Sequence, residues 1–222
     1  MQGSVISNYF SFRAALVALS NHSSLRAALV VLFSSFVFSL IGRAATSDTL
    51  FYVDAHELRV INRAFSDTTP LFTRVPESKW SLVRKDIEWG MRCSTGIGIR
   101  FRSDSRTIAA RYTLRYDFAM SWMAYTGIKG TDLYVLGDDG VWHYLATGRP
   151  QHDSIQDIVY TRNLDGKEHE FLINLPLYDG IGMFEVGVQQ GAMLSSPAVE
   201  NPRTKGGKVV FWGTSVMQGG CA

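Results

Sequence analysis

The residue best suited to covalent chemistry is Ser215, in the run Gly213-Thr214-Ser215-Val216 near the end of the 222-residue sequence. The residues just before this run, Lys208 to Trp212, are mostly apolar and predict a buried strand. A Gly-Thr-Ser turn after such a strand places a hydroxyl at the strand's carboxyl end, where open α/β sheets bind ligands. On the residues alone, a serine in a Gly-rich turn is more often structural, so Ser215 is at this point only a candidate for the nucleophile of an acyl transfer.

The acidic positions are weaker candidates for chemistry. Asp132 begins a predicted strand directly after Gly130-Thr131, a position where aspartate usually accepts hydrogen bonds from the N–H groups of a turn. A structural role is therefore favoured over catalysis. Asp138-Asp139 lies between glycines and is typical of a solvated turn rather than a metal site. His143 and His169 alternate with apolar residues, so we expect them at the surface or at a sheet edge.

Aromatic side chains suggest a different class of function, in which a module binds carbohydrate. Trp122 and Tyr125 lie in a predicted loop just before Thr126-Gly127, and loops are where functional residues concentrate. Further aromatic residues that could stack on sugar rings are Trp80, Trp89, Trp142 and Tyr144. Most tryptophans in a sandwich belong to its core, so a carbohydrate-binding module is the alternative interpretation, with Trp122 and Tyr125 as its first candidates.

Alternation with a period of two predicts strands in the middle of the chain. Apolar residues recur at Ile97, Ile99 and Phe101, and then at Ile108, Ala110, Tyr112, Leu114 and Tyr116. The positions between the second set carry Arg111, Thr113 and Arg115. One apolar and one polar face is typical of half-buried antiparallel strands.

Turn residues connect further predicted strands. Asp132–Leu136 and Val141–Ala146 flank Gly137-Asp138-Asp139-Gly140, and Asp-Gly between apolar runs is a strong hairpin signal. Glu170–Leu175 and Met183–Gln189 flank a Pro/Gly-rich loop in the same way. Helical periodicity is nearly absent after residue 50. Short strands at regular spacing predict a mainly β fold, a jelly-roll-like antiparallel β-sandwich.

The amino-terminal region predicts export. Residues 1–47 contain three arginines and no acidic residue. The apolar run Ala27–Ile41 is shorter than the roughly 20 residues of a membrane-spanning helix, and it closes on Ala44-Ala45. This pattern predicts a signal peptide over residues 1–45 and a secreted or periplasmic protein. An uncleaved signal anchor is the alternative, because the segment before the apolar run is long.

Charge and cysteine content exclude several classes of function. Removal of residues 1–45 leaves 19 basic against 20 acidic residues. No basic stretch is interleaved with aromatics, so a nucleic-acid surface is not expected, and neither is stable membrane insertion after cleavage. Cys93 and Cys221 are expected to be separate buried thiols rather than a disulfide. Two cysteines without histidines at ligand spacing predict no metal site.

Two blocks of residues resemble known families. Gly213-Thr214-Ser215-Val216 followed by Gln218-Gly219-Gly220-Cys221-Ala222 resembles the first block of the SGNH (GDSL-like) hydrolases. Gly130-Thr131-Asp132-Leu133-Tyr134 resembles the signature of the GxDLY domain, the β-sandwich that precedes such hydrolase domains in bacterial esterases. Further agreement comes from Ile99–Phe101, Thr126-Gly127 and Leu175–Gly180. The likeness spans residues 65 to 222.

The resemblance implies a serine esterase with Ser215 as the nucleophile and its backbone N–H as one oxyanion donor. It also implies a histidine base with an aspartate three residues before it, and further oxyanion donors from a Gly and an Asn on later loops. The five histidines, His22, His56, His143, His152 and His169, all precede Ser215, and none has an aspartate at that spacing. We therefore expect the base and these donors beyond Ala222, and no activity from the 222 residues alone.

The expected organisation has four parts. They are a signal peptide (1–45), a GxDLY-type β-sandwich (46–195), a linker (196–207) and the start of a truncated α/β, flavodoxin-like SGNH hydrolase domain (208–222). Gly130, Asp132, Leu133 and Tyr134 are expected to be structural motif residues. As the resemblance implies, the parent protein would hydrolyse ester bonds, plausibly acyl groups on carbohydrate, without a metal or organic cofactor.

Overall fold

The structure is a computed structural model that describes residues 49–65, 70–116, 119–151, 154–197, 211 and 213–220. The predicted signal peptide lies outside the described residues, as do most of the predicted linker and, apart from Phe211, the predicted strand 208–212. His152 and Cys221 also lie outside them.

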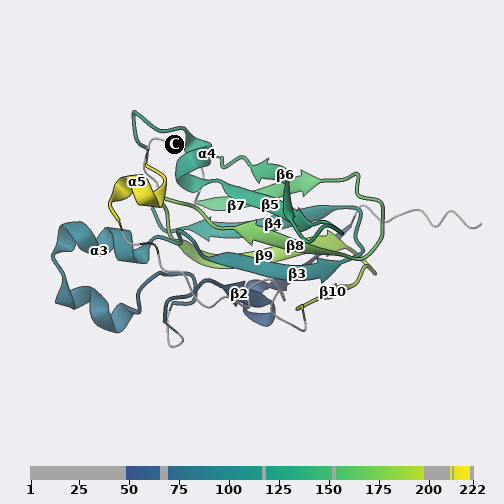
Figure 1. Cartoon of the computed structure of the whole chain (residues 1–222), viewed down its shortest axis with the longest axis horizontal. Coiled ribbons are helices and arrows are strands. Elements are labelled where there is room, and N and C mark those ends of the chain that lie inside the picture. Colours follow the sequence, from purple (N-terminus) through teal and green to yellow (C-terminus); the bar gives the residue numbers. More distant parts are fainter. Residues whose placement is uncertain are drawn as a thin grey trace, which may run out of the picture. The chain divides into compact units, whose positions relative to one another are not determined.

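The described strands form two antiparallel sheets (Figure 1). The first sheet has the order β1-β9-β4-β7, with β1 Leu50–Asp54, β9 Ile181–Gln189, β4 Ile108–Leu114 and β7 Ile155–Thr161. The second has the order β3-β8-β5-β6, with β3 Gly98–Ser103, β8 His169–Asn174, β5 Thr131–Leu136 and β6 Trp142–Gly148. The short strands β2 Arg59–Ile61 and β10 Leu194–Ser195 pair with the free edge of β3.

This strand order is that of a jelly roll. In the first sheet β1 pairs with β9, β9 with β4 and β4 with β7; in the second β3 pairs with β8, β8 with β5 and β5 with β6. Apart from the β5–β6 hairpin, each of these pairs joins strands that are not consecutive in the chain. Eight strands in two four-stranded sheets with this connectivity make two Greek keys. The predicted mainly β, jelly-roll-like sandwich is therefore confirmed.

The core lies between the sheets, and alternation of buried and more exposed residues is clearest on β7 and in the second half of β4. On β4, Ile108, Ala110 and Tyr112 are buried, whereas Arg111 is partly exposed, as the alternation predicts. The Tyr112 ring stacks on Phe184 of β9 with ring centroids 5.3 Å apart. Offset aromatic pairs of this kind add to the free energy gained from apolar burial.

Short helices occupy the connections. They are the 3-10 helices η1 Ala55–Glu57 and η2 Glu77–Leu82, and the α-helices α3 Lys85–Arg92, α4 Tyr125–Lys129 and α5 Ser215–Gln218. Helices were expected to be nearly absent after residue 50, so α3 was not predicted. It has eight residues, and none of them is completely buried. Within the described part of the chain, every helix is too short or too polar to span a membrane.

Candidate active site

Ser215 begins the one-turn helix α5, which ends at Gly219. Gly219 has the left-handed φ of 100°, a conformation that favours glycine at the end of a helix. The N–H of Gly220 donates to the Ser215 carbonyl at 2.7 Å and closes the turn. The Ser215 side chain is exposed, and its hydroxyl has no hydrogen-bond partner among the described residues. The turn thus exposes a hydroxyl that the described part of the chain leaves without a partner.

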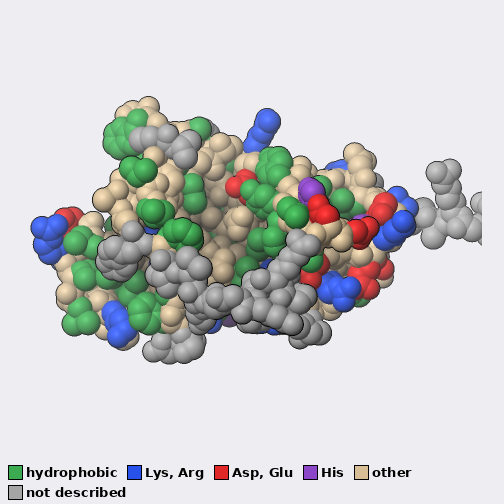
Figure 2. Space-filling model, in the orientation of Figure 1, with side chains coloured by type: hydrophobic (Ala, Val, Ile, Leu, Met, Phe, Trp, Pro, Cys, Tyr) green, Lys and Arg blue, Asp and Glu red, His purple; other side chains and the backbone are tan. Residues whose placement is uncertain are grey.

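The end of the sandwich that carries α3 and α4 receives α5 (Figure 1). Tyr178, in the loop between β8 and β9, donates its hydroxyl to the Ser215 carbonyl at 2.9 Å. The Gln218 amide donates to the Leu177 carbonyl at 2.8 Å. Figure 2 shows hydrophobic side chains on the surface at this end of the molecule, and the exposed apolar residues include Trp122, Val216 and Met217.

No general base reaches Ser215 within the described residues. Each described histidine is instead hydrogen bonded to an aspartate near it in sequence: His56 to Asp54 at 2.6 Å, His143 to Asp139 at 3.0 Å and His169 to Asp165 at 2.8 Å. These pairs were not predicted, because their spacings of two and four residues differ from the family's three. The expectation that the base is not supplied by the residues before Ser215 therefore remains a prediction.

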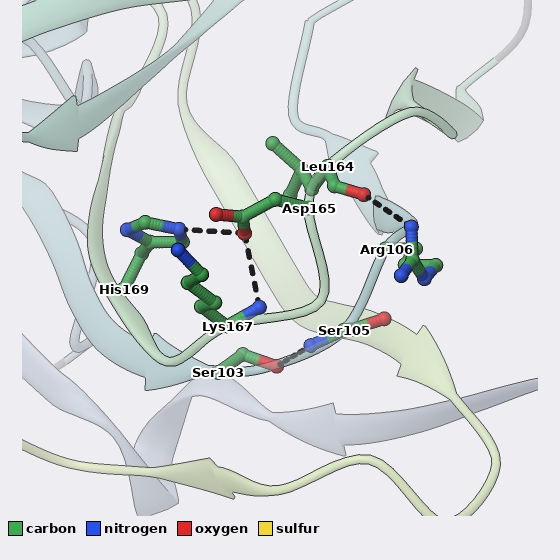
Figure 3. A network of polar contacts seen from close by, with 7 residues as sticks. All are labelled: Ser103, Ser105, Arg106, Leu164, Asp165, Lys167 and His169. Carbon is green, nitrogen blue, oxygen red and sulfur yellow. Dashed lines mark hydrogen bonds and ion pairs between the residues drawn. The ribbon is translucent and has the colours of Figure 1, made fainter.

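A second serine lies near an Asp–His pair. Ser103 of β3 is paired in register with His169 of β8, and Asp165 binds the imidazole (Figure 3). However, the Ser103 hydroxyl is fully buried and donates to the Met193 carbonyl at 2.6 Å. It also accepts the N–H of Ser105. A hydroxyl whose proton and lone pair are both engaged inside the protein cannot attack a substrate, so this group is structural.

The predicted sugar-binding pair is only partly accessible. Trp122 lies in the turn before α4, and 68% of its side chain is exposed. Tyr125 is the first residue of α4 and is half-buried. The ammonium group of Lys129 lies 5.0 Å from the centroid of the Tyr125 ring, so that one face of this ring is engaged in a cation–π contact. The described structure therefore favours Trp122 over Tyr125 as a platform.

Two signature residues shape the start of β5. Gly130 ends α4, and a Cβ added there would lie 2.2 Å from the Thr126 carbonyl oxygen. This distance is shorter than any real contact, so only glycine fits without a backbone shift. Leu133 is fully buried in the core. Both residues therefore have structural roles.

The other two signature residues face outward on the second sheet. Asp132 accepts a hydrogen bond from the Thr147 hydroxyl of β6 at 2.6 Å. The prediction that Asp132 accepts hydrogen bonds from turn N–H groups is therefore wrong. Asp132 lies within β5, and its side chain is directed to the neighbouring strand β6. Tyr134 packs edge to face with Tyr144 of the same strand pair, with ring centroids 5.8 Å apart. Both side chains therefore contact side chains across the sheet, and a structural role for Asp132 and Tyr134 stays a prediction.

Cys93 is a free, buried cysteine, in agreement with the expectation of a structural thiol. Burial raises the pKa of the Cys93 thiol to about 12, so that it stays protonated and unreactive at neutral pH. Among the residues the structure describes, no group of three His, Cys, Asp or Glu side chains is placed to hold a metal ion.

Asp179 is a buried carboxyl group that the sequence reasoning missed. Its Oδ1 accepts the N–H groups of Tyr116 at 3.0 Å and of Gly180 at 2.7 Å. Its Oδ2 is buried without a hydrogen-bond partner in the described structure. Burial raises the pKa of Asp179 to about 6, although these N–H groups and the ammonium of Lys129 act in the opposite direction. The sequence signal that could have identified Asp179 is its position as a charged residue inside the Pro/Gly-rich loop between two predicted strands.

The fold and the turn together define an ancillary β-sandwich that carries a serine turn at one end. Residues 50–194 match the family model GxDLY, described as the N-terminus of Esterase_SGNH_hydro-type. The chain belongs to this family. The predicted GxDLY domain of an SGNH-type esterase is thereby confirmed.

One solved structure supports the fold, and a second match is more distant. A candidate GDSL-like lipase from Bacteroides ovatus ATCC 8483 is 28% identical with a TM-score of 0.63, over 67% of this chain and 43% of that one. The salicylyl-acyltransferase SsfX3 from a tetracycline biosynthetic pathway is 17% identical with a TM-score of 0.47, over 71% of this chain and 41% of that one. The chain therefore spans less than half the length of either protein. No curated protein matches it.

Proposed function

We propose that the chain is the N-terminal ancillary domain and nucleophile turn of a secreted SGNH-type serine esterase. The observation that carries this proposal is the exposed hydroxyl of Ser215 at the start of α5, in a segment that follows a GxDLY sandwich in the sequence. The similarity to the GDSL-like lipase from Bacteroides ovatus supports the same class. Less than half of that protein corresponds to this chain, which leaves room for a separate catalytic domain in the relative. The remaining catalytic groups would come from residues after Ala222.

In the proposed reaction, the Ser215 oxygen attacks the carbonyl carbon of an ester while a histidine base takes its proton. The Ser215 N–H and donors from later loops stabilise the negative charge on the carbonyl oxygen. The C–O bond to the alcohol then breaks, and the alcohol leaves with the proton from the histidine. Water hydrolyses the acyl-enzyme by the same steps and releases the acid. The substrate class we propose is an acyl ester of a carbohydrate.

Translation beyond Ala222 tests this proposal. We define the extended protein as the polypeptide encoded when the reading frame continues past that residue. An open frame that supplies Asp-x-x-His, and hydrolysis of p-nitrophenyl acetate by the extended protein, would support the esterase. Turnover by the 222-residue chain itself, abolished in Ser215→Ala, would contradict the assignment of the base to later residues. An authentic stop codon after Ala222 would leave a sandwich without esterase activity.

Exposure of Trp122 favours a second candidate function, a non-catalytic module that binds carbohydrate. Trp122 lies in the turn that leads into α4, and it is exposed. An exposed indole presents a flat apolar face of the kind on which sugar rings stack. The two functions are compatible, since a carbohydrate-binding sandwich could present a carbohydrate ester to an attached esterase domain.

We expect Trp122→Ala to weaken binding of a soluble polysaccharide about tenfold, because one aromatic contact contributes about 1.4 kcal/mol. Affinity gel electrophoresis of the 222-residue chain over a panel of polysaccharides measures this change. Tyr144→Ala is the matched control, since Tyr144 is also an exposed aromatic residue but lies on β6. Equal losses in both variants, or no binding to any polysaccharide, would exclude the Trp122 site.

A further inference from the structure

We propose that Tyr178 and Gln218 dock the nucleophile turn on the end of the sandwich, so that the GxDLY domain is a positioning element for Ser215. The docking stands on contacts within this chain. Its catalytic consequence rests on the proposed esterase function. Tyr178 and Gln218 would act on the reaction only through the backbone of Ser215, and they are positioning residues rather than catalytic ones.

The side-chain amide of Gln218 is held by three separate segments of the sandwich. Its Nε2 donates to the Leu177 carbonyl at 2.8 Å and to the Thr95 hydroxyl oxygen at 3.2 Å. Its Oε1 accepts from the Arg74 guanidinium at 3.3 Å. The Thr95 hydroxyl in turn donates to the Leu177 carbonyl. An amide that uses both donors and its acceptor on one surface has a defined orientation.

Tyr178 holds the residue that carries the nucleophile. Its hydroxyl donates to the Ser215 carbonyl at 2.9 Å, and 95% of its side chain is buried. The Tyr178 ring stacks on Trp89 of α3 with centroids 6.0 Å apart, and it packs with Met123 and Ile128. The Tyr178 ring is therefore held by residues outside α5. A fixed donor loses little side-chain entropy when the hydrogen bond forms.

The two glycines after Gln218 allow the turn to lie directly on this surface. A Cβ added at Gly219 would lie 2.8 Å from Leu177 Cδ1. A Cβ added at Gly220 would lie 2.7 Å from the Tyr178 hydroxyl oxygen. Side chains at either position would push the turn away from the sandwich. The Gln-Gly-Gly sequence and the Leu177-Tyr178 loop are therefore complementary in shape as well as in hydrogen bonding.

Fixing the Ser215 carbonyl matters because it belongs to the same residue as the attacking hydroxyl. The carbonyl and the Ser215 Cα are directly bonded, so a hydrogen bond at the carbonyl limits rotation and displacement of the turn. A misplacement of about 1 Å in an active site can cost about 100-fold in rate. The free Ser215 hydroxyl leaves the side chain available for the histidine, while the backbone is held from behind.

Hydrogen exchange of the 222-residue chain tests the docking. The amides of residues 217–220 are hydrogen bonded within the turn and can report its opening. We expect Tyr178→Phe and Gln218→Ala to speed their exchange at least about fivefold, the factor that corresponds to one net hydrogen bond. Tyr144→Phe is the matched control, because it removes a hydroxyl bonded to Thr147 on β6. Equal exchange in all four proteins, or rates like those of an unfolded peptide in the wild type, would overturn the docking.

Kinetics of the extended protein test the positioning. We expect Tyr178→Phe to lower kcat about tenfold at unchanged KM, because orientation of the nucleophile affects the reaction and not ground-state binding. Fluorophosphonate labelling of Ser215 should slow by the same factor, whereas Tyr144→Phe should match the wild type. An unchanged kcat in a Tyr178→Phe protein with faster exchange would refute positioning. Absence of any Ser215-dependent turnover would refute the esterase function. In that case the hydrogen-exchange rates of residues 217–220 would be the test of the docking.

Discussion

Ser215→Ala should lower ester hydrolysis by the extended protein about 10,000-fold or more, because loss of the nucleophile removes the covalent route altogether. The hydroxyl is exposed and has no partner within the described residues, so alanine removes no hydrogen bond that these residues make, and we expect the effect to be confined to the reaction. The measurement is kcat/KM with p-nitrophenyl acetate, together with thermal unfolding of both proteins. Unfolding should be unchanged.

Ser196→Ala provides the control for this experiment. Its hydroxyl donates to the Glu57 carbonyl on the sandwich, away from α5. The control should retain full activity. Residual turnover by Ser215→Ala within about tenfold of the wild type would mean that another group is the nucleophile, since a missing nucleophile leaves only binding and oxyanion stabilisation.

Asp179 should make the unfolding free energy fall as the pH rises from about 4 to about 6. The pKa of Asp179 is about 6 in the folded protein, against an ordinary value of 3.8. Between these values the unfolded state releases a proton that the folded state keeps, so increasing pH favours unfolding. The stabilisation present below pH 4 is lost as pH rises through the folded pKa, and the loss at pH 7 is about 3 kcal/mol.

Asp179→Asn isolates this contribution. Asparagine keeps an acceptor for the N–H groups of Tyr116 and Gly180 and does not ionise. We expect urea denaturation to give equal stability for variant and wild type at pH 4, and a more stable variant at pH 7. Asp138→Asn removes one carboxylate from an exposed turn and controls for the change in net charge. A wild type that becomes relatively more stable than Asp179→Asn between pH 4 and pH 6 would contradict the prediction.

Local signals were sufficient to predict several elements. Alternation along β4 and the Gly-Asp-Asp-Gly turn between β5 and β6 both describe neighbouring residues, and the structure places these strands as expected. In contrast, β7 was not predicted. Its buried face includes Gln156, a polar residue that the Gln151 backbone satisfies with two hydrogen bonds. A buried polar residue interrupts the alternation on which strand prediction depends.

Partners distant in sequence were beyond the reach of the same reasoning. Asp132 was expected to bind a turn, but its partner Thr147 comes from the opposite strand. The helix α3 is short and polar. Its Trp89 stacks on Tyr178, which lies in a loop distant in sequence. Ser215 could be singled out because its signal is a contiguous run of residues. Tyr178 and Asp179 could not, because their roles follow from how loops meet at one end of the fold.

The pairing of β1 with β9 joins one of the first strands of the domain to be synthesised with one of the last. Leu50 pairs with Gln189, so the first sheet cannot be completed until nearly the whole domain has left the ribosome or crossed a membrane. Domains dominated by such long-range pairing fold slowly, in milliseconds to seconds. Until β9 is available, β1 and the edge of β4 that pairs with β9 lack their hydrogen-bonding partner, and unpaired strand edges promote aggregation. A chaperone that shields these edges until residue 189 is released would therefore protect this protein from aggregation during its biogenesis.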